Sequence, residues 1–492
     1  MKGRVYLVGA GPGDSGLITV KGANLLKEAN VVVYDSLIGD GIRNYINPKA
    51  EMIYVGKRSG NHSKTQDEIN SILVEYGLKG GIVVRLKGGD PFLFGRGGEE
   101  IASLKKAGIE YEVVPGVTSA IGAAAYAGIP VTHRGVASSL HIITGHLKDE
   151  SYGINFKALA SLNGTLVFLM GISALETITG SLISEGMDEN TPCAVVESGT
   201  TSNQRVTIST LKGIKDEAKR VKIKSPGIII VGDVCSLAKE YSWIENMPLF
   251  GTRILVTRPK EVASKLSTIL EKRGASVTSI NTISIDKIDR KGFLYAASNI
   301  SDYKWAIFTS PSGVNEFFNC LKEEELDIRI LYGVKIAAVG PSTAKSIESR
   351  GLIVDFIPSR YDGETLGKEI GDIDSCILFR AAKGNEEVVK ILEARGVKCL
   401  DTPIYKTSSV KQNINVEDYD YITFTSKSCI EGFVESTGLD DYSNINAICI
   451  GETTARLGRS LSMNVYVSEK ATLESMANLL EKIRRDNNGL KG

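Results

Sequence analysis

The chain has 492 residues, 42% of them hydrophobic and 24% charged, which is ordinary for a globular protein. Its 58 basic residues balance 58 acidic ones, so the net charge gives no reason to expect nucleic acid or an anionic membrane as a partner. No stretch reaches the roughly eighteen apolar residues of a membrane-spanning helix, and the length predicts roughly three or four compact units.

The seven cysteines are scattered and never spaced as C-x-x-C, and the four histidines show no metal-ligand spacing. We therefore expect reduced thiols in a cytoplasmic protein, with no metal site. The apolar run near the N-terminus ends at a glycine after four residues, too short for the core of a signal peptide.

Short β-branched runs, each followed by a stretch of helical period, alternate along the chain. This alternation predicts an α/β fold with substantially parallel sheets. The clearest strands are expected at Val5–Val8, Val31–Tyr34, Ile82–Leu86, Thr165–Met170 and Ile228–Gly232. The pattern breaks at Ser242–Gly251, and a fresh strand begins at Arg253–Thr257. We therefore place a domain boundary near residue 248, between domains 1–247 and 248–492.

A glycine-rich loop, Gly9–Asp14, follows the first strand and lets the backbone approach a ligand closely. It is either a structural strand-to-helix turn or a dinucleotide-binding loop, for which Asp35 would be the ribose-binding acid. The spacing is G-x-G-x-G rather than G-x-G-x-x-G, and Pro12 lacks the N–H that a pyrophosphate would need. The sequence therefore disfavours a nicotinamide cofactor.

Two further loops follow strands. Gly88-Gly89-Asp90 lies at a strand's carboxyl end, where open α/β sheets bind ligands. Val114–Ala120 adds small hydroxyl side chains at an expected helix start. Three converging loops of this kind predict a pocket for a flat, polar ligand, which composition alone does not identify.

Long motifs fill the first half of the chain. They are VGAGPGDSGLIT (Val8–Thr19), VVVYDSLI (Val31–Ile38), VGKRSGNHSKTQDEIN (Val55–Asn70), VRLKGGDPFLFGRGGEE (Val84–Glu100), VVPGVTSAIGAAAYAGIPVTHR (Val113–Arg134), TGH (Thr144–His146), FLMG (Phe168–Gly171) and IIIVGDV (Ile228–Val234). In type and order they resemble the uroporphyrinogen-III C-methyltransferase family, within the tetrapyrrole methylase superfamily. The resemblance covers about residues 1–245.

This resemblance implies that S-adenosyl-L-methionine (SAM) lies between two α/β lobes. The residues it implies for holding SAM are Pro12, Gly88, Gly89, Asp90, Leu93, Thr118, Ser119, Met170 and the backbone near Gly199. Asp35 is similar to the family's proton acceptor and Lys57 to its proton donor. Methylation of an electron-rich pyrrole carbon needs a base for the displaced proton, and no metal. Alternatively, Asp35 is a cap or turn carboxylate and Lys57 a surface salt-bridge partner.

Uroporphyrinogen III carries eight carboxylates, so its cleft should contain fixed cations, preferably arginines. The candidates are Arg96 and Arg134, with Arg58 and His133 behind them. Each could instead be a solvated surface residue. Arg96 is favoured because it lies among glycines beside the presumed SAM loop.

The second half contains an internal repeat. Ile307–Ser310 is followed by Ala337–Ala344, and later Ile422–Ser426 is followed by Ile448–Ala455. In both pairs one strand ends in Phe-Thr-Ser, and a second ends in glycine before a Thr-Ala helix start. This repetition predicts two similar α/β lobes.

A second series of motifs runs through this half. They are ILVTRP (Ile254–Pro259), FTSPSGV (Phe308–Val314), AVGPSTA (Ala338–Ala344), FRAAKGNE (Phe379–Glu386), TPIYKT (Thr402–Thr407), ITFTSKS (Ile422–Ser428) and IGETTA (Ile450–Ala455). They make residues 251–488 similar to uroporphyrinogen-III synthase. The resemblance implies two Rossmann-like lobes with the active cleft between them, one formed by 252–283 plus 410–488 and the other by 284–407.

That enzyme closes linear hydroxymethylbilane with inversion of the last ring, so much of its catalysis can be conformational. Tyr405 is similar to the family's tyrosine near the leaving hydroxyl and is expected to donate a proton, unless it only packs at the lobe hinge. Thr343 and Thr454, at equivalent helix starts, are candidates for binding propionates, as are Ser310 and Ser426. Ordinary N-caps would look the same in sequence.

The two resemblances together predict a bifunctional enzyme that makes uroporphyrinogen III and methylates it twice with SAM, at C2 and C7, giving precorrin-2 for siroheme or cobalamin. One alternative is a methyltransferase with a non-catalytic C-terminal binding module. Another is a nicotinamide-dependent enzyme, which would need a second dinucleotide loop that the sequence lacks. We expect a homodimer formed through the methyltransferase half, as is common in that family.

Overall fold

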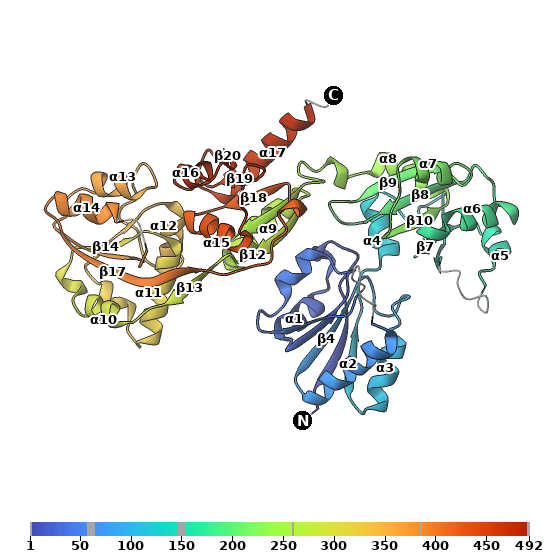
Figure 1. The fold of residues 1–492 in the computed structure, drawn as a ribbon, viewed down its shortest axis with the longest axis horizontal. Helices are drawn as coiled ribbons and strands as arrows, with labels where there is room; N and C mark the ends of the chain where they lie inside the picture. Colours follow the sequence, from blue (N-terminus) through green and yellow to red (C-terminus); the bar gives the residue numbers. More distant parts are fainter. Residues whose placement is uncertain (1, 57–63, 146–152, 258–259, 384–385, 490–492) are drawn as a thin grey trace. The chain divides into compact units, whose positions relative to one another are not determined.

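The computed structural model describes residues 2–56, 64–145, 153–257, 260–383 and 386–489. The chain forms two compact units: residues 1–254 with 267–279 and 484–492, and residues 255–266 with 280–483. Within the described residues the strands form four five-stranded sheets with helices packed against them (Figure 1). The predicted α/β class is confirmed. Nowhere in these ranges is a helix long and apolar enough to cross a membrane.

The first sheet is entirely parallel, with strand order β3-β2-β4-β1-β5. Its strands are β1 (Arg4–Gly9), β2 (Val31–Tyr34), β3 (Glu51–Tyr54), β4 (Ile82–Lys87) and β5 (Glu110–Val114). On one face α2 (Gln66–Lys79) and α3 (Gly97–Lys106) pack through Leu73 and Leu104. On the other, α1 (Val20–Glu28) and the 3-10 helix η2 (Asp40–Tyr45) pack through Leu26 and Ile42. Because both faces are covered, the central strands β1, β2 and β4 are largely apolar, with Val5, Val32 and Val84 fully buried.

The second sheet has strand order β6-β7-β10-β8-β9 and is mostly antiparallel, so the expectation of parallel sheets is wrong here. Its strands are β6 (Leu140–Thr144), β7 (Thr165–Leu169), β8 (Pro192–Glu197), β9 (Arg205–Thr210) and β10 (Gly227–Val231). The loop 198–204 joins β8 to β9 and is too short for the crossover that parallel neighbours need. The associated helices are α4 (Ser119–Tyr126), α5 (Phe156–Ala160), α6 (Leu175–Ser184), α7 (Ile214–Arg220) and α8 (Ala238–Tyr241), with 3-10 helices Ile172–Ala174, Asp233–Leu237 and Ile244–Asn246.

The third sheet combines strands from well-separated parts of the chain, in the order β12-β11-β18-β19-β20. Its strands are β11 (Arg253–Thr257), β12 (Ser276–Ile280), β18 (Tyr421–Phe424), β19 (Asn446–Cys449) and β20 (Asn464–Val467). The helices of these segments are α9 (Lys260–Glu271), α15 (Lys427–Thr437), α16 (Glu452–Ser460) and α17 (Leu473–Gly489), with the 3-10 helix Val416–Asp418.

The fourth sheet uses only residues 283–409, in the order β13-β17-β16-β14-β15. Its strands are β13 (Ile283–Lys287), β14 (Trp305–Phe308), β15 (Lys335–Ala338), β16 (Ser375–Ala381) and β17 (Lys398–Ser409). Its helices are α10 (Lys291–Ser298), α11 (Pro311–Glu323), α12 (Pro341–Glu348), α13 (Gly363–Glu369) and α14 (Glu387–Ala394), with 3-10 helices Ile300–Asp302 and Ile328–Leu331. One face packs an aromatic cluster in which the rings of Phe317 and Phe379 lie 4.7 Å apart. The other face packs against α13 and α14.

The internal repeat of the second half extends to backbone conformation. Ser310 and Ser426 are the N-caps of α11 and α15, with φ/ψ of −161°/156° and −162°/163°. Gly340 and Gly451 are the N-caps of α12 and α16, with φ/ψ of −172°/173° and −175°/171°. The strand–cap–helix unit therefore occurs twice in the same form, and the predicted repeat is confirmed.

Candidate active sites

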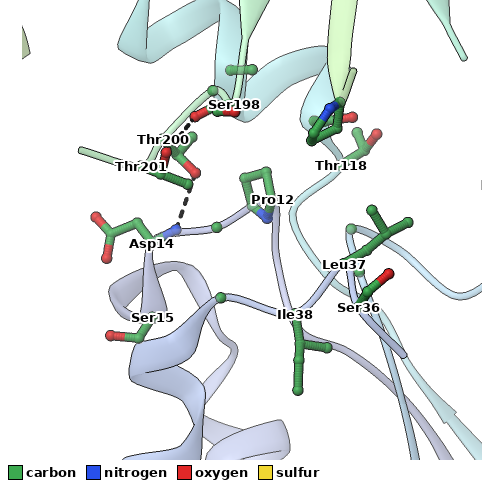
Figure 2. A pocket seen from close by; sticks show the side chains of 18 of the residues that line it. Pro12, Asp14, Ser15, Ser36, Leu37, Ile38, Thr118, Ser198, Thr200 and Thr201 are labelled. Atoms are coloured by element: carbon green, nitrogen blue, oxygen red, sulfur yellow. Dashed lines mark hydrogen bonds between the residues drawn. The ribbon is translucent and has the colours of Figure 1, made fainter. Parts of the chain in front are cut away.

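A cavity of the first unit opens beyond the carboxyl ends of β1, β2 and β4, and the loop 198–203 after β8 also lines it. Every residue matched to a SAM contact lines it: Pro12, Gly88, Gly89, Asp90, Leu93, Thr118, Ser119, Met170 and Gly199. Figure 2 shows Pro12, Thr118 and Thr200 around this space. The structure thus gathers into one place residues spread over almost 190 positions of sequence, from 12 to 199.

The three glycine loops meet backbone to backbone. Gly89 N donates to Gly11 O at 2.8 Å, and Gly11 N donates back to Gly89 O at 3.3 Å. A Cβ on Gly9 would lie 2.5 Å from Gly116 Cα, and one on Gly116 would lie 2.2 Å from Gly89 O. Only glycine fits at such distances, so the predicted convergence of the loops is confirmed.

Asp90 fastens these loops together. Its Oδ1 accepts from Phe92 N at 2.8 Å and from Leu93 N at 3.1 Å, while Oδ2 accepts from Gly116 N at 3.0 Å. The resemblance to the methyltransferase family implies that Asp90 contacts SAM. In the structure both oxygens already have backbone donors, so a ligand could use only their remaining lone pairs.

Asp35 lies directly after β2 on the cavity wall, with 22% of its side chain exposed. Its Oδ1 accepts from Leu37 N at 3.0 Å, which is the turn role considered as its alternative. Its Oδ2 accepts from Arg85 Nη2 at 3.1 Å. The carboxylate is therefore oriented from two sides while part of it still faces the cavity.

Arg85 belongs to a buried ionic network that the sequence analysis missed. Its Nε lies 3.2 Å from Glu100 Oε1, and the same oxygen lies 2.8 Å from Lys87 Nζ. Arg85, Lys87 and Glu100 are 4%, 6% and 0% exposed. Burial, with the nearby Arg85 cation, lowers the pKa of Lys87, which Glu100 partly offsets. The sequence carried one sign of this network: two charged residues, Arg85 and Lys87, stand at alternate positions of the otherwise apolar strand β4.

Strained backbone gathers around the same cavity. Phe94, Arg96, Met170, Ser198 and Thr200 all line it and all have positive φ, between 45° and 69°. Such conformations are costly for residues other than glycine, and they persist at functional sites because surrounding contacts impose them.

The basic residues that were proposed to bind the substrate's carboxylates do not all lie in the cavity. Arg96 lines the cavity and pairs through two nitrogens with Glu99, both at 2.7 Å, while 57% of its side chain is exposed. Arg134 is exposed and is not part of the cavity lining. Lys57 and Arg58 lie outside the described residues.

In the second half, Tyr405 on β17 is 5% exposed, and its hydroxyl lies 3.0 Å from Ser310 Oγ. Ser310 Oγ also accepts from Gly313 N at 3.0 Å, so it caps α11 and contacts Tyr405 at once. Burial, helped by Glu316, raises the pKa of Tyr405, and the Ser310 hydrogen bond opposes this. The tyrosine therefore stays protonated and can act as a donor.

Thr343 and Thr454 are not N-caps. Each is the third residue of its helix, after the caps Gly340 and Gly451, and they are only 1% and 5% exposed. Ser426 is half-buried and caps α15 by accepting from Cys429 N at 3.3 Å. The side chains of Thr343 and Thr454 are therefore covered, and their backbone N–H groups donate to Gly340 O and Gly451 O.

Comparison with known proteins gives a consistent result. Residues 4–215 match the family model of tetrapyrrole (corrin/porphyrin) methylases, and residues 264–478 match that of uroporphyrinogen-III synthase HemD. The chain is 44% identical, over 98% of both chains, to the porphyrin biosynthesis protein HemD of Ruminiclostridium josui. It is 53% identical to the uroporphyrinogen-III C-methyltransferase of Methanocaldococcus jannaschii, over 48% of this chain and 98% of that one.

One solved structure that resembles the chain is the Thermus thermophilus uroporphyrin-III C-methyltransferase with S-adenosylhomocysteine. Its identity is 39%, its TM-score is 0.42, and the match covers 48% of this chain and 100% of that one. A mutant uroporphyrinogen-III synthase from the same organism matches at 16% identity and a TM-score of 0.37, over 48% of this chain and 99% of that one.

The fold and the cavity define the first half as a SAM-dependent tetrapyrrole methylase. Over its whole length the chain belongs to the family of the porphyrin biosynthesis protein HemD, in which such a methylase is joined to a uroporphyrinogen-III synthase. The predicted bifunctional enzyme is confirmed at this level. In the described ranges no group of three or more His, Cys, Asp or Glu side chains is arranged to hold a metal ion.

Proposed function

We propose that residues 248–492 close hydroxymethylbilane to uroporphyrinogen III and that residues 1–247 methylate this product twice, at C2 and C7, to precorrin-2. Precorrin-2 then supplies siroheme or cobalamin synthesis. The observation that carries the methylation is the single cavity in which every residue matched to a SAM contact lies beside Asp35.

The cavity suits SAM in shape and chemistry. Gly89 leaves room for a ligand close to the backbone, while the absent side chain of Gly88 makes room for Leu37. Leu93 and Met170 offer apolar contacts for a flat ring. Pro12 and Gly199 line it with backbone and little side chain. When bound, SAM supplies an activated methyl group on a sulfonium, so the reaction needs no metal.

Asp35 is the proposed base. Forming a new bond at a pyrrole carbon leaves the macrocycle with a proton to lose. The partly exposed Asp35 carboxylate can accept that proton, while Arg85 and Leu37 N fix its orientation. The proposal that Lys57 donates a proton rests on the family match alone.

The substrate is proposed to lie on an apolar rim beside fixed cations. Leu37, Phe94 and Met170 line the cavity and are 59%, 40% and 53% exposed, an arrangement that suits a macrocycle's hydrocarbon face. Arg96 would bind one carboxylate of the substrate from inside the cavity, and Arg134 would act further out.

For the synthase half, Tyr405 is the proposed proton donor to the leaving hydroxyl of hydroxymethylbilane. Ser310 can donate its own proton to Tyr405 Oη while accepting from Gly313 N, which leaves the tyrosine proton free for the substrate. Propionates would be bound at the helix starts of Ser426, Thr343 and Thr454, chiefly by backbone N–H groups.

Two proposals concern the whole protein. We propose a homodimer formed through the methyltransferase half, because such dimers are common in that family. A cytoplasmic location is proposed because all seven cysteines are free, as is usual in a reducing compartment.

The test is a coupled assay with full-length protein, hydroxymethylbilane and SAM, with products separated by chromatography and identified by mass. A dimethylated type-III product supports both activities. Methylated type-I product would mean that ring closure was uncatalysed, leaving a methyltransferase with a non-catalytic second half. Unmethylated type-III product would overturn the methylation.

A further inference from the structure

We propose that Thr200 and Gln204 are positioning residues for the cofactor, because with Asp14 and Tyr126 they close a ring of hydrogen bonds that holds the loop 198–201 against the first glycine loop. This inference rests on the proposed function, since it takes Pro12 and Gly199 as SAM contacts. Asp14 and Tyr126 lie within the sequence motifs, but the sequence analysis gave none of these four residues a role of its own.

The ring runs through four hydrogen bonds. Asp14 N donates to Thr200 Oγ1 at 3.0 Å, and Thr200 N donates to Gln204 Oε1 at 2.8 Å. Gln204 Nε2 donates to Tyr126 O at 3.1 Å, and Tyr126 Oη donates to Asp14 Oδ2 at 2.6 Å. Figure 2 shows the bond between Asp14 N and Thr200. The ring therefore ties a loop of the first sheet to α4 and to the loop after β8.

The ring holds a loop that would not keep its shape unaided. Ser198 and Thr200 flank Gly199 and have φ of 45° and 69°, conformations that side chains other than glycine disfavour. Thr200 and Gln204 are each only 4% exposed, so their polar atoms have little access to water in place of these partners. Thr201 Oγ1 adds a bond to Ser198 O at 2.7 Å.

Close packing leaves the two loops little freedom to shift. A Cβ on Gly13 would lie 2.6 Å from Thr201 Cγ2 and 2.8 Å from Thr200 Oγ1. A Cβ on Gly199 would lie 2.3 Å from the Cβ of Ala123 in α4. Trp243 also packs against Tyr126, one of the four hydrogen-bonded residues. The two aromatic side chains meet edge to face, with their ring centroids 4.9 Å apart. The separation of Pro12 from Gly199, and with it the cofactor's space, is fixed by this arrangement.

The test is Thr200→Val in the full-length protein, with binding of S-adenosylhomocysteine measured by calorimetry. Valine has the same shape and the same backbone preference as threonine, so the change removes only the acceptor for Asp14 N. We expect Kd to rise about tenfold and the KM for SAM to rise in parallel, with kcat at saturating SAM close to wild type. Thr200→Ser, which keeps the hydroxyl, should restore binding.

Thr179→Val is the matched control, because Thr179 is also 4% exposed but bonds only carbonyls of its own helix, such as Leu175 O at 3.0 Å. It should lower Tm without changing Kd. Tyr126→Phe tests the opposite side of the ring without altering the loop, and it should weaken binding less than additively with Thr200→Val. Wild-type Kd in both ring variants overturns the inference. A wild-type protein that does not bind S-adenosylhomocysteine overturns the proposed function instead.

Discussion

Arg85 donates to Asp35 across 3.1 Å from a position that is 4% exposed, while the carboxylate it holds is 22% exposed. The arginine is thus a fixed part of the first sheet, and the aspartate that it orients is the more exposed of the two groups on the cavity wall. Because Arg85 is itself held by the fully buried Glu100, the orientation of the proposed base depends on a group that does not line the cavity.

Asp35→Asn should abolish methylation and leave SAM binding intact. The amide oxygen can still accept from Leu37 N, but it cannot take up a proton, so we expect the methylation rate to fall roughly 100-fold or more. Single-turnover methylation and S-adenosylhomocysteine calorimetry measure the two effects separately. Asp216→Asn, in the exposed first turn of α7, is the control. A collapse of cofactor affinity would instead make Asp35 a binding or structural residue.

Glu100→Gln should destabilise the first half strongly. It leaves Arg85 and Lys87 buried together with one anion fewer, and breaking a buried ionic pair costs on the order of 3 kcal/mol. Denaturant unfolding of the full-length protein measures the change in that transition. The neighbour Glu99→Gln breaks only an exposed pair, so it should change stability by less than about 1 kcal/mol. Equal effects of the two substitutions would contradict a structural role for the network.

Gly89→Val should abolish SAM binding, although not by collision within the protein. A Cβ on residue 89 would lie 3.9 Å from Thr118 Cα, so the protein has space for it. The φ of 67°, however, is a left-handed conformation that β-branched residues strongly disfavour. The loop must then move away from Gly11. Gly98→Ala, with open space around its Cβ in α3, should raise stability by about 0.5 kcal/mol and leave binding unchanged. Undiminished SAM affinity in Gly89→Val would refute the proposed site.

Ser310→Ala and Ser426→Ala form a matched pair, because both serines cap helices with the same geometry. Each loss of a cap should cost about 1 kcal/mol of stability. Only Ser310 contacts Tyr405, so Ser310→Ala should also slow type-III ring closure well beyond Ser426→Ala. The measurement is the ratio of type-III to type-I product. Equal ratios would show that the contact between Ser310 and Tyr405 has no catalytic role.

The pH dependence of ring closure follows from Tyr405. Since burial raises its pKa above the ordinary 10.0, the donor form persists on the alkaline side. The enzymatic rate should therefore show no alkaline decline caused by Tyr405 below pH 10.0. Profiles of wild type and Tyr405→Phe, each corrected for uncatalysed closure, give the comparison. A decline near neutrality that Tyr405→Phe removes would exclude this assignment.

Much of the fold and of the first site could be predicted from the sequence, because both depend on local signals. Apolar runs gave strands such as Val31–Tyr34 with the observed bounds, and the Phe-Thr-Ser echo revealed the repeated caps. The glycine loop that begins at Gly9 indicated close backbone approach, and a Cβ on Gly9 would indeed lie 2.5 Å from Gly116 Cα, a distance that only glycine tolerates. The motifs then identified the family, and with it the residues that line the cavity.

Tertiary structure alone decided the partners. Nothing local to Thr200 or Tyr126 indicates that both contact Asp14, which lies more than 100 residues earlier in the chain. Likewise, the sequence allowed Thr343 to be a helix N-cap. In the structure Gly340, three residues earlier, is the N-cap of α12, and the Thr343 side chain is buried. The sequence by itself thus determined which residue types line the cavity. Long-range hydrogen bonding and burial determined what orients them, because both depend on segments that only folding brings together.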